Sequence, residues 1–110
     1  MELVHALVVG DGERNLIVLH GFLGMGDNWK THAKNWASQG WRVHLIDQRN
    51  HGRSFWSADF GYEEMAEDLR HYFNENQLQQ ATILGHSMGG KVAMRFACLY
   101  PETGEELIVA

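Results

Sequence analysis

Short, uninterrupted apolar runs alternate along this chain with longer segments in which apolar residues recur every three or four positions. An uninterrupted run is typical of a strand buried on both faces of a parallel sheet, whereas the longer recurrence is typical of a helix with one buried face. Strands are expected at residues 3–9, 16–19, 41–46, 81–84 and 107–109. The alternation predicts an α/β fold, in which helices flank a mainly parallel sheet.

Three helices are expected between these strands. The first covers residues 28–39, with Asp27 as its N-cap and Gly40 at its end. The clearest covers residues 62–73, and the last covers residues 91–99. Each helix lies between two strands that follow each other in the sequence, so the order of elements after the leading strand predicts right-handed crossovers between parallel strands.

Composition narrows the class of protein. An apolar share of 45% excludes a wholly disordered chain, and the length suits one domain over residues 1–110. A net charge of −5 argues against a nucleic-acid partner. The lone Cys98 cannot form an intrachain disulfide, and no segment has the pattern of a signal peptide or a membrane span. These features predict a cytoplasmic protein that does not bind membranes.

The sequence Gly85-His86-Ser87-Met88-Gly89 has the pattern G-x-S-x-G and stands between an expected strand and an expected helix. In that context the serine lies on a sharp turn that exposes its hydroxyl. The two glycines let strand and helix approach closely, and the N-terminus of the helix offers N–H groups to a developing oxyanion. The pattern predicts that Ser87 is a nucleophile.

A second motif, His20-Gly21-Phe22, follows another expected strand. If Ser87 attacks a carbonyl group, the N–H of Met88 is one oxyanion donor and the N–H of Phe22 is the other. Gly21 permits the close backbone approach that this arrangement needs. We expect His20 to brace the loop by hydrogen bonding rather than to act as a general base.

Residues 47–54 form a third motif, DQRNHGRS, whose density of polar side chains predicts a loop organised by its own hydrogen bonds. In order and spacing, residues 19–24, 47–54 and 85–90 resemble three successive motifs of the α/β-hydrolase family. The likeness is closest to the small esterase and thioesterase-like branch of that family.

The resemblance implies acyl transfer by a Ser–Asp/Glu–His triad acting on a small-molecule ester or thioester. It implies that Ser87 is the nucleophile, that the N–H groups of Phe22 and Met88 form the oxyanion hole, and that neither a cofactor nor a metal is needed. In this family the acid and the histidine follow the serine along the chain.

The residues after Ser87 depart from that pattern. They contain no histidine and no aspartate, and their acidic residues are Glu102, Glu105 and Glu106. The resemblance therefore implies an N-terminal half of the fold that ends at the sixth strand of the family's sheet. We expect a serine hydrolase whose 110 residues alone are weak or inactive.

Two other functions remain open at this point. One is a dinucleotide-binding module, because Gly24-Met25-Gly26 follows a strand and Asp47 ends the next, although Trp29 occupies the third glycine position. The other is a folded half-domain without turnover. The seven histidines lack zinc-binding spacing, so we expect no metal.

The expected sheet also predicts an assembly. The strand at residues 107–109 would form an open edge, and the helix at residues 28–39 alone would cover one apolar face. Uncovered apolar surface of this kind marks an interface. We therefore expect a homodimer or a complex with a complementary C-terminal half.

Overall fold

The computed structural model describes residues 2–110, apart from the exposure and side-chain contacts of residues 104 and 105. Its strands are β1 (His5–Val9), β2 (Arg14–Leu19), β3 (Trp41–Asp47), β4 (Ala81–Gly85) and β5 (Gly104–Val109). Its helices are a short 3₁₀ helix η1 (Gly26–Trp29), α1 (Lys30–Ala37), α2 (Tyr62–Glu75) and α3 (Met88–Leu99). Every strand and helix expected from the sequence is present, and the α/β class is confirmed.

The five strands form one sheet in the order β1-β3-β2-β4-β5. β1 runs antiparallel to β3, and the other neighbouring pairs are parallel. The register places Leu19 of β2 opposite Ile46 on one side and Gly85 on the other. The loops that follow β2, β3 and β4 therefore lie together at the carboxyl edge of the sheet, where open α/β sheets bind their ligands.

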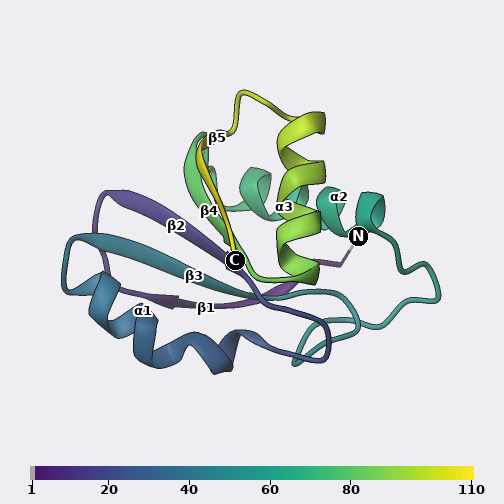
Figure 1. The fold of residues 1–110 in the computed structure, drawn as a ribbon, viewed down its shortest axis with the longest axis horizontal. Coiled ribbons are helices and arrows are strands. Elements are labelled where there is room, and N and C mark those ends of the chain that lie inside the picture. The colour runs from purple at the N-terminus through teal and green to yellow at the C-terminus, as the bar shows by residue number, and fades with distance from the viewer. Residues whose placement is uncertain (1) are drawn as a thin grey trace.

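Helices cover both faces of the sheet (Figure 1). α2 and α3 pack on one face, where Phe73 and Phe96 are fully buried and their ring centroids lie 5.1 Å apart. α1 packs on the other face, where Ala33 joins a smaller core with Val43. No helix in residues 2–110 combines the length and the apolar character that crossing a bilayer requires.

The start of the first helix differs from the sequence prediction. Asp27 is not an N-cap, because it lies inside η1 and the N-cap position of α1 is Trp29. The physical reason is Asn28, whose side-chain oxygen accepts the N–H of Met25 at 2.9 Å and closes a tight turn before the α-helix begins. Asp27 instead lies 3.5 Å from the ammonium group of Lys30 on the surface.

A buried histidine in β3 makes folding sensitive to acid. His44 bonds the hydroxyl of Tyr72 at 2.7 Å and the side-chain oxygen of Asn15 at 2.9 Å, and its burial lowers its pKa from 6.5 to about 4. Because the unfolded chain binds this proton more readily, stability is complete above pH 6.5 and falls by up to about 3 kcal/mol as the pH drops toward 4. Urea unfolding at about pH 7.5 and about pH 4.5 measures the loss. An equal loss in a His44→Leu variant would contradict this assignment.

Candidate active site

Ser87 occupies the turn between β4 and α3. It is the N-cap residue of α3, its φ is +54°, and it is exposed. A positive φ is uncommon outside glycine and costs about 1–3 kcal/mol, so the surrounding structure must hold the turn in place. The serine thus lies at the carboxyl edge of the sheet with the N-terminus of a helix behind it.

Two glycines make this turn possible. A Cβ atom on Gly89 would lie 2.1 Å from the carbonyl oxygen of Leu19, and one on Gly85 would lie 2.4 Å from the carbonyl oxygen of Gly89. Both distances are far below van der Waals contact, so neither position tolerates a side chain. The predicted close approach of strand and helix is confirmed.

The loop after β2 passes beside Ser87. A Cβ atom on Gly21 would lie 3.1 Å from Cδ2 of His86 and 3.5 Å from Cβ of Ser87. Phe22 is the next residue after Gly21, and Met88 is the next residue after Ser87, so the N–H groups of both belong to the two segments that lie close together here. Within residues 2–110, neither N–H donates a hydrogen bond to another protein group. The structure therefore brings together the three residues that the motifs single out.

His20 has the structural role expected from the sequence. Its ring is buried, its Nε2 accepts the N–H of Gln48 at 3.0 Å, and its Nδ1 donates to the carbonyl oxygen of Gly21 at 2.8 Å. Burial lowers the pKa of His20, which favours this neutral form. Because both ring nitrogens are occupied, the imidazole fixes the loop and cannot also accept a proton from Ser87.

The loop at residues 47–54 is organised by its own hydrogen bonds, as expected. Its Asp47 carboxylate accepts the N–H of Gly26 at 2.6 Å through Oδ1 and the N–H of Arg53 at 3.2 Å through Oδ2. The hydroxyl of Ser54 donates to the Asp47 carbonyl oxygen. In a dinucleotide site this carboxylate would face a ribose, whereas here it binds the backbone. The geometry thus disfavours the dinucleotide alternative.

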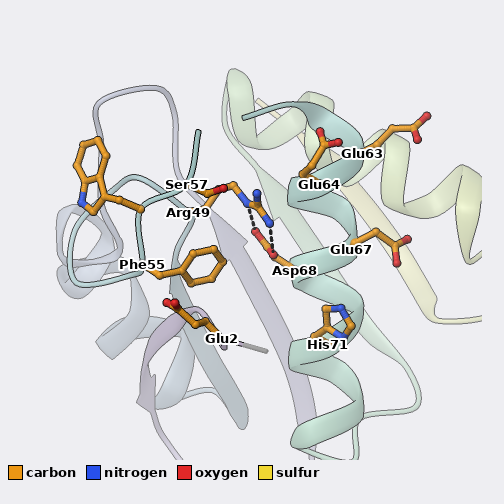
Figure 2. Close-up of a pocket in the computed structure, with 10 residues that line it drawn as sticks. Glu2, Arg49, Phe55, Ser57, Glu63, Glu64, Glu67, Asp68 and His71 are labelled. Atoms are coloured by element: carbon orange, nitrogen blue, oxygen red, sulfur yellow. Dashed lines mark hydrogen bonds and ion pairs between the residues drawn. The ribbon is translucent and has the colours of Figure 1, made fainter. Parts of the chain in front are cut away.

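Arg49 fastens the same loop to α2, and Figure 2 shows its guanidinium directed at Asp68. The two N–H···O distances are 2.6 and 2.8 Å, and the hydrogen bonding raises the pKa of Arg49. This pair borders an acidic cavity of about 620 Å³ that Ser87 does not line. The cavity is lined by Glu2, Arg49, Phe55, Trp56, Ser57, Glu63, Glu64, Glu67, Asp68 and His71.

Two further cavities, of about 460 Å³ each, share Ser87 and Phe22 as lining residues. The remaining residues of the first are Phe60, Gly61, Tyr62, Met65, Met88 and Lys91. Those of the second are His20, Gly21, Leu23, Gly24, Asn28, Trp29, His32 and His86. An extended ligand with its reacting group at Ser87 fits this arrangement, since one part can lie on either side.

Sequence reasoning missed the aromatic surroundings of Phe22. The ring centroid of Phe22 lies 5.7 Å from that of His51 and 6.3 Å from that of Phe60. Both partners come from the segment between β3 and α2. The strand order could have predicted this cluster, because loops that follow neighbouring parallel strands lie at the same edge of the sheet.

Comparisons with known proteins agree with this geometry. Residues 14–103 match the alpha/beta hydrolase fold family. The chain is 40% identical to the sn-1-specific diacylglycerol lipase ABHD11 of Mus musculus, over 99% of this chain and 36% of that protein. The solved structure of a marine microorganism esterase is 44% identical, with a TM-score of 0.94 over 99% of this chain and 41% of that one. A thioesterase domain from the curacin biosynthetic pathway is 28% identical, with a TM-score of 0.89 over 97% of this chain and 41% of that domain.

The chain spans about a third of the length of the sequence relatives that it matches. Within that span, the family match and the superposition on a solved esterase both agree with the α/β fold of this chain, with its mainly parallel sheet and helices on both faces. The chain therefore belongs to the α/β hydrolase family.

Proposed function

We propose that Ser87 is the nucleophile in the cleavage of a carboxylic ester or thioester, and that the N–H groups of Phe22 and Met88 form its oxyanion hole. One observation carries this proposal. The exposed Ser87 has a strained backbone and lines one cavity with Phe22 and Met88 at the N-terminus of α3, and the N–H groups of Phe22 and Met88 have no protein partner within the described residues. The esterase and thioesterase among the similar structures support the substrate class.

In this reaction the Oγ of Ser87 attacks the carbonyl carbon and gives its proton to a base. The carbonyl oxygen becomes an oxyanion, which the two N–H groups stabilise. The C–O or C–S bond then breaks, the leaving alcohol or thiol takes up the proton, and the acyl group stays on Ser87. Attack by water releases the acid and restores the serine.

The base is the part of the proposal that the residues after Ser87 do not supply, since they contain no histidine and no aspartate. His20 and His51 do not fill the role, because each already uses both ring nitrogens in hydrogen bonds. We propose that a complementary segment or a second copy provides the base. The 110 residues alone are then a folded but catalytically incomplete half-domain with weak or no turnover.

In this proposal, each of the two cavities that Ser87 lines binds one part of the substrate. The cavity beside Phe60, Tyr62 and Met65 has mainly apolar and aromatic walls, which suit the hydrocarbon part of an acyl group. The other cavity holds Trp29 and His86, whose ring centroids lie 5.9 Å apart. Its mixed lining suits a more polar alcohol or thiol group.

An activated ester tests the proposal. Incubation with a p-nitrophenyl ester is expected to release p-nitrophenol slowly, because neither the acylation of Ser87 nor its deacylation has a general base. The measurement is the absorbance of p-nitrophenol over time. A Ser87→Ala variant is expected to lose most of this release, and Ser38→Ala, which alters an exposed serine after α1, is the matched control. Release that is unchanged in Ser87→Ala excludes Ser87 as the nucleophile.

The open edge of β5 supports the proposed assembly. Within residues 2–110, β5 pairs only with β4, and its side chains Leu107, Ile108 and Val109 are all exposed. An unpaired strand edge with exposed apolar side chains favours association. Sedimentation of the 110-residue chain at low micromolar concentration is expected to show a dimer, or a monomer that binds a hydrophobic dye. A monodisperse monomer that binds no dye would contradict the expectation.

A further inference from the structure

The turn at residues 21–24 has a strained backbone conformation. The N–H of Gly24 donates to the carbonyl oxygen of Gly21 at 3.0 Å, and Leu23 at the third position has φ = +64°. A positive φ at the third position, without a positive φ at Phe22 in the second, is typical of a type II turn, which normally has glycine or asparagine at the third position. The leucine side chain is 82% exposed, so its packing contributes little to offset the strain. Another contact must therefore hold the turn.

That contact comes from His51, which lies 28 residues further along the chain. Its Nε2 accepts the N–H of Leu23 at 3.0 Å, and its Nδ1 donates to the carbonyl oxygen of Arg49 at 2.9 Å. These two bonds fix one neutral tautomer of a ring that is only 5% exposed. The same ring meets Phe22 edge-on, at a centroid distance of 5.7 Å and an interplanar angle of 75°.

We propose that His51 is a positioning residue: by accepting the N–H of Leu23 it holds the type II turn and keeps the N–H of Phe22 directed beside Ser87. This inference rests on the proposed function, because it assigns His51 to the oxyanion hole of the same site. Without the bond, Leu23 relaxes toward negative φ and the backbone around Phe22 moves with it. An oxyanion donor is effective only within about 2.7–3.1 Å of the oxygen, so a small displacement is costly.

The test measures the rate at which a fluorophosphonate labels Ser87, together with the NMR signal of the Leu23 amide. His51→Ala is expected to slow labelling about ten- to hundredfold, as misplacement by about 1 Å does, and to raise hydrogen exchange at the Leu23 amide. His51→Ala combined with Leu23→Gly is expected to recover most of the labelling rate. Glycine adopts the positive φ without strain and needs no histidine to hold it. His71→Ala, at the separate acidic cavity, is the matched control.

Two results would overturn the proposal. One is a wild-type labelling rate in His51→Ala. The other is an equally slow rate in the single and double variants when both give native-like spectra, because the effect would then not pass through the turn. Failure of the proposed function is distinguishable, since the unmodified chain would then show no labelling at Ser87. In that case hydrogen exchange at the Leu23 amide still tests whether His51 holds the turn. An exchange rate that is the same in His51→Ala and in the unmodified chain would exclude the positioning contact.

Discussion

Placing residues 1–110 into the marine microorganism esterase, in exchange for the segment that they match, is expected to raise ester hydrolysis about 10²–10⁴-fold over the 110-residue chain. General acid–base catalysis contributes a factor of this size. In this family the acid and the histidine follow the nucleophile along the chain, so the remaining part of the esterase would bring both to Ser87. The exchange is geometrically reasonable, because the two structures superpose with a TM-score of 0.94 over 99% of this chain.

The measurement is the steady-state hydrolysis of a p-nitrophenyl ester by the purified chimaera, with circular dichroism to confirm folding. Ser87→Ala in the chimaera is expected to remove the gain, whereas Ser38→Ala is expected to keep it. A folded chimaera that is no faster than the 110-residue chain would show that the site at Ser87 does not accept the missing groups.

Replacing Phe22 by proline is expected to slow the reaction at Ser87 about 10²–10³-fold, the usual cost of losing one oxyanion donor. Proline has no N–H, and position 22 is the second residue of a type II turn, where proline is favoured. The variant therefore removes the donor with little disturbance of the turn. Phe22→Ala keeps the N–H and is expected to keep most of the rate, although it loses the ring contacts with His51 and Phe60.

The rate of fluorophosphonate labelling at Ser87 measures this effect in the 110-residue chain, and hydrolysis measures it in the chimaera. The comparison between Phe22→Pro and Phe22→Ala distinguishes the effect of losing the backbone N–H from the effect of losing the side chain. Equal rates for Phe22→Pro and the unmodified chain, with the fold intact, would dismiss the assignment of Phe22.

The fold was largely predictable because two periodicities identify its elements. An apolar run at residues 16–19 and a mainly apolar run at residues 81–84 marked the central strands β2 and β4, and both runs are buried as a parallel sheet requires. The start of the first helix was not predictable in the same way. Asp27 has the right side chain for an N-cap, but the competing bond from Met25 to Asn28 closes a 3₁₀ turn first. Local propensity does not reveal which of two neighbouring polar residues will make the capping bond.

The candidate site was predictable where a motif specifies its own geometry. Ser87, Gly85 and Gly89 are adjacent in sequence, and the strained turn follows from their order alone. The supporting contacts were not predictable, because they join loops that are distant in sequence. The bond from Leu23 to His51 spans 28 residues and depends on strands β2 and β3 being neighbours in the sheet.

Covalent labelling tests most directly whether Ser87 is the nucleophile. The 110-residue chain is exposed to a fluorophosphonate, its intact mass is measured, and the modified residue is located by peptide mapping. The predicted result is a single adduct on Ser87, with no adduct in Ser87→Ala and an unchanged adduct in Ser38→Ala. An adduct at another residue, or equal labelling of Ser87→Ala, would contradict the account.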